Sequence, residues 1–562
     1  MPMPRLKYLP AALCTSLLAA CASTGTAPAA SATAPAGAIA VEVPAVAHPQ
    51  GETAEWWYRS GAAQAAARGA MAGQARNVIL FLGDGMSLTT VAAARILEGQ
   101  RRQQPGEENL LSWERFPHTG FSKTYNTDSQ TPDSAGTMTA ITTGVKSHMG
   151  AIGVSAGRRD DCADSLGKQR LTWLHLADAA GMATGIVTTA RLTHATPAAT
   201  WAHSPNRNWE HDADLPAKAV AEGCVDIARQ MVSTPYGRGP TVLFGGGRAQ
   251  FMPVDARDPE HAGRTGLRRD GRDLVAEWKA AHPGSAYVWN REQLQAAAGA
   301  PAVLGLFEYD HLQFEHERDA AAEPSLAELT AEAIRRLSQH PEGFVLMVEG
   351  ARIDHANHYG NAYRALDETI AMAEAVRTAA ELTSPEDTLI LVTADHSHTL
   401  NFVGYPVRGN PILDKVRDQD GDEARDLTGL PYTTLGYANG PGHAGASNQQ
   451  PEGPKRFLHA PSTAKPAHGR PDLSQVDTTD PDYLQEALVP LKSESHGGED
   501  VGIWARGPGS EAVRGTLEQN AIYHVIVQAT PKLRERLCQA GTCDVNGVPV
   551  QLPQPQQFRS KD

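Results

Sequence analysis

The sequence has no excess of positive charge and little that would hold it in a membrane. Its 562 residues include 50 Lys and Arg against 64 Asp and Glu, which gives a formal net charge of −14. So acidic a chain is poorly suited to the phosphate backbone of nucleic acids, which argues against nucleic-acid binding as its main role and leaves room only for a local basic pocket. Beyond the N-terminus no apolar run reaches the length of a membrane span, and there are no internal repeats.

The N-terminus is typical of a secretory signal. Arg5 and Lys7 precede the apolar stretch LPAALCTSLLAA, which runs into LAAC at Cys21. Small residues before that cysteine are typical of a bacterial lipoprotein, so we expect residues 1–20 to be removed and Cys21 to carry lipid. This predicts an exported protein in the periplasm or at the outer-membrane face. The alternative is an ordinary signal cleaved nearby, with an incidental cysteine. Residues 21–40, rich in Ala, Thr, Ser and Pro, are interpreted as a flexible tether.

Cysteine is scarce, with six in the whole chain, and two of these lie in or next to the apolar N-terminal stretch. An even number then remains, namely Cys162, Cys224, Cys538 and Cys543. In an exported chain this favours two disulfide bonds, one closing a short C-terminal loop and the other a long one. Free buried thiols and a different pairing are the alternatives.

Short apolar runs that end in Gly, Asp or Glu predict strands buried on both faces, at residues 77–85, 184–191, 241–247, 343–350 and 387–396. Between them lie segments of helical periodicity, such as 325–339 and 362–382. Strands alternating with helices predict an α/β fold, a three-layer sandwich with a largely parallel central sheet flanked by helices. The pattern stops over 403–492, where Gly, Pro and Asn dominate. That stretch is interpreted as an insertion at the rim of one catalytic domain, residues 41–562.

Side chains that can bind metal follow the predicted strands, where ligands of such folds bind. Asp354 and His358 are four residues apart, so one helical turn places both on the same face. Other candidates lie in separate short motifs, namely Asp84, Glu349, Asp395, His396 and His496. A single Asp-His pair is usually a turn or cap, but five such clusters in one fold indicate a metal site. Carboxylates and imidazoles without cysteine fit zinc and magnesium together.

The stretch QTPDSAGTMTA, residues 130–140, predicts a helix N-terminus, because a Pro and Asp-Ser precede small residues. By itself Ser134 is an ordinary cap residue. The free N–H groups and the dipole at such a terminus also favour an anion. Whether Ser134 is more than a cap depends on what the rest of the chain gathers around it.

Taken as a set, the motifs GDGM, PDSAGT, HATPAATWAHSPNRNW, VEGARIDHANH, VTADHSH and SHGGEDV resemble those of alkaline phosphatases, in the family's order. The similarity covers nearly the whole chain after the tether, and NRNW, RIDHANH and TADHSH are most similar to the animal, tissue-type branch. The resemblance implies hydrolysis of small phosphate monoesters at alkaline pH, through a phosphoserine intermediate. It also implies a homodimer. With lipid on Cys21, the protein would be anchored to a membrane.

The resemblance implies a role for each site residue. Ser134 becomes both helix cap and nucleophile, and Arg207 clamps the phosphate through two parallel hydrogen bonds. One Zn²⁺ ion is assigned to Asp354, His358 and His496. A second Zn²⁺ ion, which also meets the Ser134 oxygen, is assigned to Asp84, Asp395 and His396. One Mg²⁺ ion is assigned to Asp84, Thr196, Glu349 and waters.

Two histidines are placed behind these ligands by the same resemblance. His194 is expected to reach magnesium through water, and His355 matches the animal pattern. Ala135 follows the nucleophile where animal enzymes have Gly, and Thr196 replaces their Ser but keeps the hydroxyl. His398 is interpreted as a loop or core histidine that lies close enough to the metal ligands to support them.

The animal branch also implies a calcium site far from the catalytic centre, with ligands at Glu260, the Phe307 carbonyl, Glu308 and Glu323. Glu323 stands where Asp is usual, and the alternative is four surface acids. The family's disulfides would pair Cys162 with Cys224 and Cys538 with Cys543. Residues 54–73 resemble its N-terminal dimer arm, and residues 403–492 its crown insertion.

Three rival functions remain. A phosphodiesterase of the same superfamily usually has a Thr nucleophile and lacks this Arg and the magnesium site. A sulfatase needs a Cys-x-Pro-x-Arg segment, which the sequence lacks. A lipoprotein that binds metal or phosphate without turnover would not need Ser134 and Arg207.

Overall fold

The computed structural model describes residues 35–233, 235–444, 453–458 and 469–560, and from Ala36 onward these belong to one folded unit. The expected signal peptide, the lipidated Cys21 and most of the tether lie outside the described residues. Within the described ranges, no helix combines the length and the apolar character that crossing a membrane requires.

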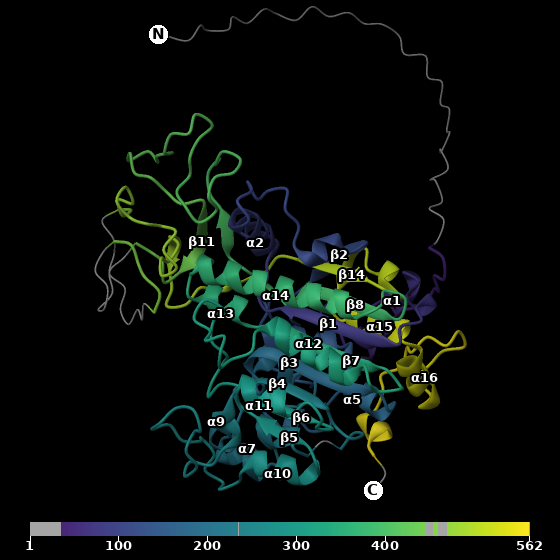
Figure 1. Cartoon of the computed structure of the whole chain (residues 1–562). Helices are drawn as coiled ribbons and strands as arrows, with labels where there is room; N and C mark the ends of the chain where they lie inside the picture. Colours follow the sequence, from purple (N-terminus) through teal and green to yellow (C-terminus); the bar gives the residue numbers. More distant parts are fainter. Residues whose placement is uncertain (1–34, 234, 445–452, 459–468, 561–562) are drawn as a thin grey trace, which may run out of the picture. The chain divides into compact units, whose positions relative to one another are not determined.

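A central sheet dominates the described unit and has ten strands (Figure 1). Its order is β15 (Gly515–Glu518), β2 (His118–Lys123), β14 (Val501–Arg506), β8 (Thr388–Ala394), β1 (Asn77–Gly83), β7 (Phe344–Gly350), β3 (Ala183–Arg191), β4 (Val242–Gly246), β6 (Val303–Leu306) and β5 (Ala286–Val288). From β8 to β5 every neighbouring pair is parallel. Only β14 runs antiparallel to its neighbours. The largely parallel sheet is therefore confirmed. The sequence pattern did not reveal β2 and β14, or the shorter strands β15, β6 and β5.

Helices cover both faces of this sheet, which confirms the three-layer sandwich. Along β1, Ile79 and Phe81 point into one core, together with α2 (Leu88–Arg101), α12 (Leu326–Leu337) and α14 (Ala362–Leu382). Leu80 and Leu82 point into the other core, with α1 (Ala54–Ala67), α3 (Ser134–Thr143), α5 (Trp173–Ala179) and α15 (Ala521–Ala529). In Figure 1, α12 and α14 lie across the near face of the sheet. Because β1 is buried on both sides, its whole run had to be apolar.

The register of the central strands brings their carboxyl ends together. Gly83 at the end of β1 is level with Gly350 of β7 and Ala394 of β8. Thr188 of β3 is level with Glu349 of β7. The residues that follow or end these strands therefore meet at one edge of the sheet, where ligands of such folds bind.

Both expected disulfides are formed, Cys162–Cys224 and Cys538–Cys543. The segment resembling a dimer arm begins with α1, which packs on α15 of the same chain. The rings of Tyr58 and Tyr523 are in contact, and the Asn520 amide donates to the Trp57 carbonyl over 2.8 Å. What this segment does toward a second copy stays a prediction.

The stretch interpreted as an insertion contributes two of the three strands of a small second sheet. Here β11 (Leu435–Gly440) lies between β10 (Leu400–Phe402) and β12 (Ala487–Pro490). Next to it, β9 (Ser397–His398) pairs with β13 (His496–Gly497), which sets His398 opposite His496. The insertion thus ends where candidate metal ligands are presented.

A buried acid on α14 leads to a prediction about stability. Glu368 is 4% exposed, and burial raises its pKa from 4.5 to about 8, against the lowering effect of the Glu315 N–H group and Arg352. The folded pKa lies above the unfolded one, so this group's stability contribution is complete below pH 4.5 and is lost as pH rises through 8. Between pH 4.5 and pH 8, we expect the free energy of unfolding of Glu368→Gln to rise relative to that of the wild type by roughly 1.4 kcal/mol per pH unit. Urea unfolding at pH 5, 7 and 9 measures this difference, and parallel curves would contradict it.

Candidate active site

Four buried carboxylates meet at the carboxyl edge of the sheet. Asp84 directly follows β1, Asp395 follows β8, and Glu349 is the next-to-last residue of β7. Asp354 lies one turn further on, in α13 (Arg352–His358). Asp84, Glu349 and Asp395 are completely buried and Asp354 is 4% exposed. Charge at this density is stable in a protein interior only with cations close by, which points to metal ions.

The helix at the centre of the site begins at Ser134, as the sequence predicts, but its cap is a different residue. The N-cap is Asp133, whose carboxylate accepts the Gly136 N–H group over 3.1 Å. The expectation that Ser134 itself caps the helix is therefore wrong. Because Asp133 takes the capping bond, the Ser134 hydroxyl is free to face the carboxylates.

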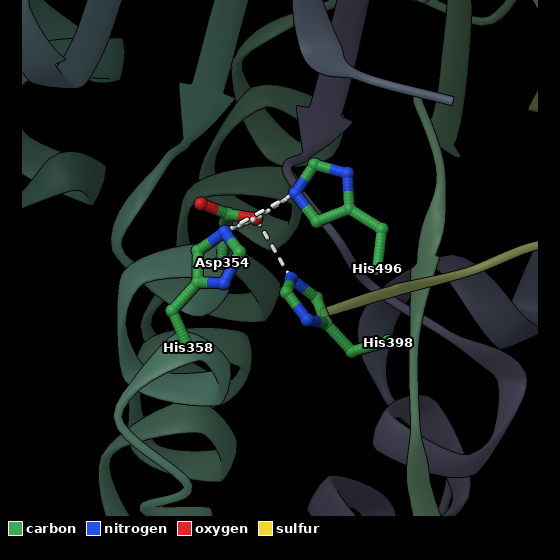
Figure 2. Close-up of side chains that lie close together, drawn as sticks. All are labelled: Asp354, His358, His398 and His496. Atoms are coloured by element: carbon green, nitrogen blue, oxygen red, sulfur yellow. Dashed lines mark hydrogen bonds and ion pairs between the residues drawn. The ribbon is translucent and has the colours of Figure 1, made fainter. Parts of the chain in front are cut away.

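The first donor set combines α13 with β13. Asp354 Oδ1 lies 3.4 Å from both His358 Nε2 and His496 Nε2, and the two nitrogens are 3.1 Å apart. Ligand atoms at 2.0 Å from a tetrahedral zinc are about 3.3 Å from one another, so the three atoms have the spacing of one zinc site with an open fourth position. Figure 2 shows the side chains converging. His496 Nδ1 donates to the Pro132 carbonyl over 2.7 Å, which leaves Nε2 for the metal.

The sequence analysis underestimated the role of His398. Its Nε2 atom lies 2.7 Å from Asp354 Oδ1, a hydrogen-bond distance and shorter than the spacing of two zinc ligands (Figure 2). Its Nδ1 atom is held by the Glu494 carboxylate. Burial lowers the pKa of His398, but Glu494 and Asp354 outweigh it and raise the pKa to about 10. His398 therefore donates to a ligand rather than acting as one.

The second donor set includes the serine. His396 Nε2 lies 3.4 Å from Asp84 Oδ1, 3.3 Å from Asp395 Oδ2 and 3.1 Å from Ser134 Oγ. Ser134 Oγ is in turn 3.4 Å from Asp84 Oδ1. Each of these four distances matches the spacing of two ligands around a tetrahedral zinc ion, so the serine oxygen lies where a zinc ligand would.

The third cluster lies on the other side of Asp84. Asp84, His194 and Glu349 offer ligand atoms within 4.8 Å of one another, and the Thr196 hydroxyl lies beside Glu349. Among the described residues, Asp84 Oδ2 and Glu349 Oε1 have no hydrogen-bond partner. Burial raises the pKa of Glu349 to about 8. Unpartnered, buried carboxylate oxygens beside a hydroxyl fit a hard cation such as magnesium.

Arg207 lies at the more open side of the site, with 22% of its side chain exposed. One Nη atom donates to Asp133 over 3.2 Å, and the other lies 3.2 Å from His194 Nε2. Burial raises the pKa of Asp133, but Arg207 and two N–H groups outweigh it and hold that pKa below its usual range. The acid that caps the Ser134 helix thus also orients the arginine.

His355 lies further back than the other predicted residues. Its ring contacts those of His194 and His311, and its Nδ1 atom is 3.0 Å from a guanidinium nitrogen of Arg352. Burial lowers its pKa well below the usual range, so it is neutral. Of the residues predicted to hold or support the zinc and magnesium ions, His355 alone belongs to none of the three donor sets.

The predicted calcium ligands are only partly brought together. Glu260 and Glu308 form a cluster with His261, whose Nε2 atom lies 3.0 Å from Glu308. Glu323 is linked to Glu308 through Gln313, which donates to both carboxylates over 3.2 and 2.9 Å. Phe307, the remaining predicted ligand, is buried next to Glu308. Glu323 Oε1 has no partner among the described residues, and burial raises the pKa of Glu323 to about 8.

Sequence reasoning also missed residues that hold the ligands in place. Thr188 donates to Glu349 over 2.5 Å from within β3, where nothing in its motif marks it. Asp133 lies within the PDSAGT motif, directly before Ser134, and Glu494 lies just outside the SHGGEDV motif, two residues before His496. Proximity to a ligand in sequence was the available signal for those two.

Two tetrahedral donor sets, one completed by a serine at a helix N-terminus, define a metal-dependent hydrolase of the α/β sandwich class. A sequence model described as alkaline phosphatase matches residues 75–531. The tissue-nonspecific alkaline phosphatase of Gallus gallus is 44% identical over 464 residues, which cover 81% of this chain and 84% of that protein. The human isozyme is 42% identical over 464 residues, covering 81% and 83%. The chain belongs to the alkaline phosphatase family, and it is a phosphatase that acts on phosphate monoesters.

Solved structures agree in fold. The alkaline phosphatase of Thermus thermophilus covers 87% of this chain and 96% of its own, with a TM-score of 0.59 and 23% identity. That from the Antarctic bacterium TAB5 covers 82% and 98%, with a TM-score of 0.53 and 20% identity. At such identities the likeness establishes the shared fold alone.

Proposed function

We propose that the chain hydrolyses phosphate monoesters at alkaline pH through a phosphoserine formed on Ser134. The observation that carries this proposal is the position of Ser134 Oγ, at 3.1 Å from His396 and 3.4 Å from Asp84. A serine that only capped the helix would turn its hydroxyl back to the helix, a task that Asp133 performs here. The hydroxyl is left among metal-binding groups, where a nucleophile belongs.

The chain's own groups account for the handling of the phosphoryl group. Ser134 Oγ attacks phosphorus in line with the leaving oxygen, and the first N–H groups of α3 stabilise the negative charge. Arg207 presents two nitrogens on one planar group, which match two phosphate oxygens. Asp133 keeps that plane oriented before the substrate arrives. Water then attacks the phosphoserine, restores Ser134 and releases inorganic phosphate.

Three metal sites are proposed for these residues. Zinc would be held by Asp354, His358 and His496, and again by Asp84, Asp395, His396 and Ser134. Magnesium would be held by Asp84, Glu349 and Thr196, with His194 close by. When bound, these ions supply positive charge that lowers the pKa of the serine hydroxyl and stabilises both the attacking and the leaving oxygens.

Activity measurements on two kinds of ester test this proposal. We expect fast hydrolysis of a phosphate monoester and little of a matched diester, because Arg207 needs two free phosphate oxygens. Arg207→Ala should raise KM for the monoester about 10- to 100-fold and narrow the preference over the diester. Faster diester cleavage by the wild type would instead favour the phosphodiesterase. Metal-loaded protein without turnover would favour a binding lipoprotein.

A structural calcium ion is proposed near Glu323, supported by its unpartnered oxygen. We expect added Ca²⁺ to raise the melting temperature of wild-type protein, and Glu323→Gln to abolish that rise while activity remains. Arg248 already donates to Glu260 over 2.5 Å, so this arginine competes with the ion for one ligand. An unchanged melting temperature in Ca²⁺ would contradict the proposal and favour surface acids.

We also propose export, lipid attachment at Cys21 and a homodimer. The N-terminal motif supports the first two. Exposed apolar side chains along and after β12 support the third, since Leu488 is 84% and Val489 47% exposed. Cys21→Ser should release the protein from membranes, and light scattering of the soluble form gives its mass.

A further inference from the structure

Glu494 is a buried glutamate that the proposed reaction does not use. It is 1% exposed and lies two residues before His496. Its Oε1 atom accepts from the Thr399 N–H group over 2.6 Å and from the Thr399 hydroxyl over 2.5 Å. Its Oε2 atom binds His398 Nδ1. A carboxylate satisfied on both oxygens is held in one orientation, so it can hold other groups in turn.

The backbone of the same residue holds His358. The Glu494 N–H group donates to the His358 carbonyl over 2.9 Å, and His358 Nδ1 donates to the Glu494 carbonyl over 2.5 Å. A histidine whose Nδ1–H group is taken in this way presents its Nε2 lone pair to the metal. The orientation of one proposed zinc ligand is therefore set by Glu494 directly.

The side chain of Glu494 reaches a second ligand through His398. With Nδ1 bound to Glu494, the other ring nitrogen of His398 donates to Asp354 Oδ1 over 2.7 Å. That oxygen is the atom lying 3.4 Å from the nitrogens of His358 and His496. The backbone of Gly85 packs against the His398 ring, so closely that a Cβ atom at this position would lie 2.3 Å from the ring.

We propose that Glu494 is a positioning residue of the metal site formed by Asp354, His358 and His496. Its carboxylate fixes His398, and His398 fixes the Asp354 oxygen in the direction of the metal. This inference rests on the proposed function, because it presumes zinc at these three ligands. It predicts that Glu494 controls how long zinc stays bound, without touching substrate.

Zinc release tests the proposal without any turnover. Protein loaded with zinc is mixed with excess chelator, and the release of each equivalent is followed by a colorimetric dye. We expect Glu494→Ala to speed release of one equivalent about 10- to 100-fold. We expect Glu494→Gln to stay near wild type, because its amide oxygen can accept from Thr399 and its NH2 group can donate to Nδ1 of a neutral His398, whose Nε2–H group still donates to Asp354. Glu98→Ala is the matched control, because among the described residues the side chain of this buried glutamate on α2 hydrogen-bonds to Arg102 and Asn109, beyond the end of that helix.

A double-mutant cycle separates positioning from general loosening. If Glu494 acts through His398, Glu494→Ala should add nothing to the release rate of a His398→Ala variant. Independent, additive effects would overturn the proposal, and so would wild-type release from Glu494→Ala. Asp354→Asn shows which idea has failed. If Asp354→Asn leaves the zinc content unchanged, the proposed metal site is wrong. If it lowers the zinc content, the metal site stands and only the proposed role of Glu494 is wrong.

Discussion

Ser134→Ala is expected to lower kcat for a phosphate monoester by at least about a thousandfold, while inorganic phosphate still binds within about tenfold of wild type. The variant removes the oxygen that forms the bond to phosphorus but leaves Arg207 and the N–H groups of α3 in place. Because Asp133 caps the helix, the loss of the hydroxyl should leave the helix intact. Steady-state kinetics and phosphate titration measure the two quantities.

A buried serine elsewhere provides the control for this variant. Ser147 is completely buried, and its hydroxyl donates to the Val154 carbonyl over 2.7 Å. Ser147→Ala should therefore lower stability by about 1 kcal/mol and leave kcat within about twofold of wild type. Trapping with labelled substrate and acid quench should yield phosphoserine in the wild type and none in Ser134→Ala. Substantial turnover by Ser134→Ala would mean that water attacks the substrate directly.

Removal of metal is expected to abolish activity and, at alkaline pH, to lower stability. Without cations, Asp84, Glu349 and Asp395 repel one another and lack hydration. Asp354 differs, because three histidines outweigh burial and lower its pKa. Burial, followed by Asp395, Asp354 and Glu349, raises the pKa of Asp84. Burial also raises that of Glu349 from 4.5 to about 8. For both groups the pKa in the folded state lies above that in the unfolded state. Their contribution to the stability of the metal-free protein is therefore present at low pH and is lost as pH rises through 8.

The gap in melting temperature between loaded and chelated protein should therefore widen from pH 5 to pH 9. Scanning calorimetry with and without chelator measures it, and zinc plus magnesium should restore both activity and stability. Asp84→Asn removes one of the four charges and the oxygen shared by two donor sets. We expect that variant to be inactive even with metals, and to show a smaller gap. Chelated protein that keeps its activity would rule out metal-assisted chemistry at Ser134.

Much of the site was predictable because ligand chemistry is local. Asp354 and His358 share a helical turn, and Asp395 and His396 are adjacent, so a motif of a few residues is enough to identify these ligands. Apolar runs buried on both faces likewise predicted the central strands. The strands β5, β6 and β15 were not predicted, because stretches of three or four residues carry too little pattern to distinguish them from loops. The six-residue strands β2 and β14 were missed as well.

The hydrogen bonds within the site required the structure. Asp133 and Ser134 are both good cap residues, and only the packed position of α3 selects Asp133 and turns Ser134 toward His396. His398 and Asp354 are 44 residues apart in sequence, and His358 and His496 are 138 apart. No local pattern sets such distances.

By itself the sequence determined the fold class, the residue types of the site and the family, because these follow from periodicity and from motifs a few residues long. The tertiary structure alone decided which atoms lie about 3.3 Å apart and so can share a metal ion. It also decided which residues, Glu494 and His398 among them, hold those atoms still. The physical reason is that the register of β1, β7 and β8 and the pairing of β9 with β13 bring remote motifs into contact.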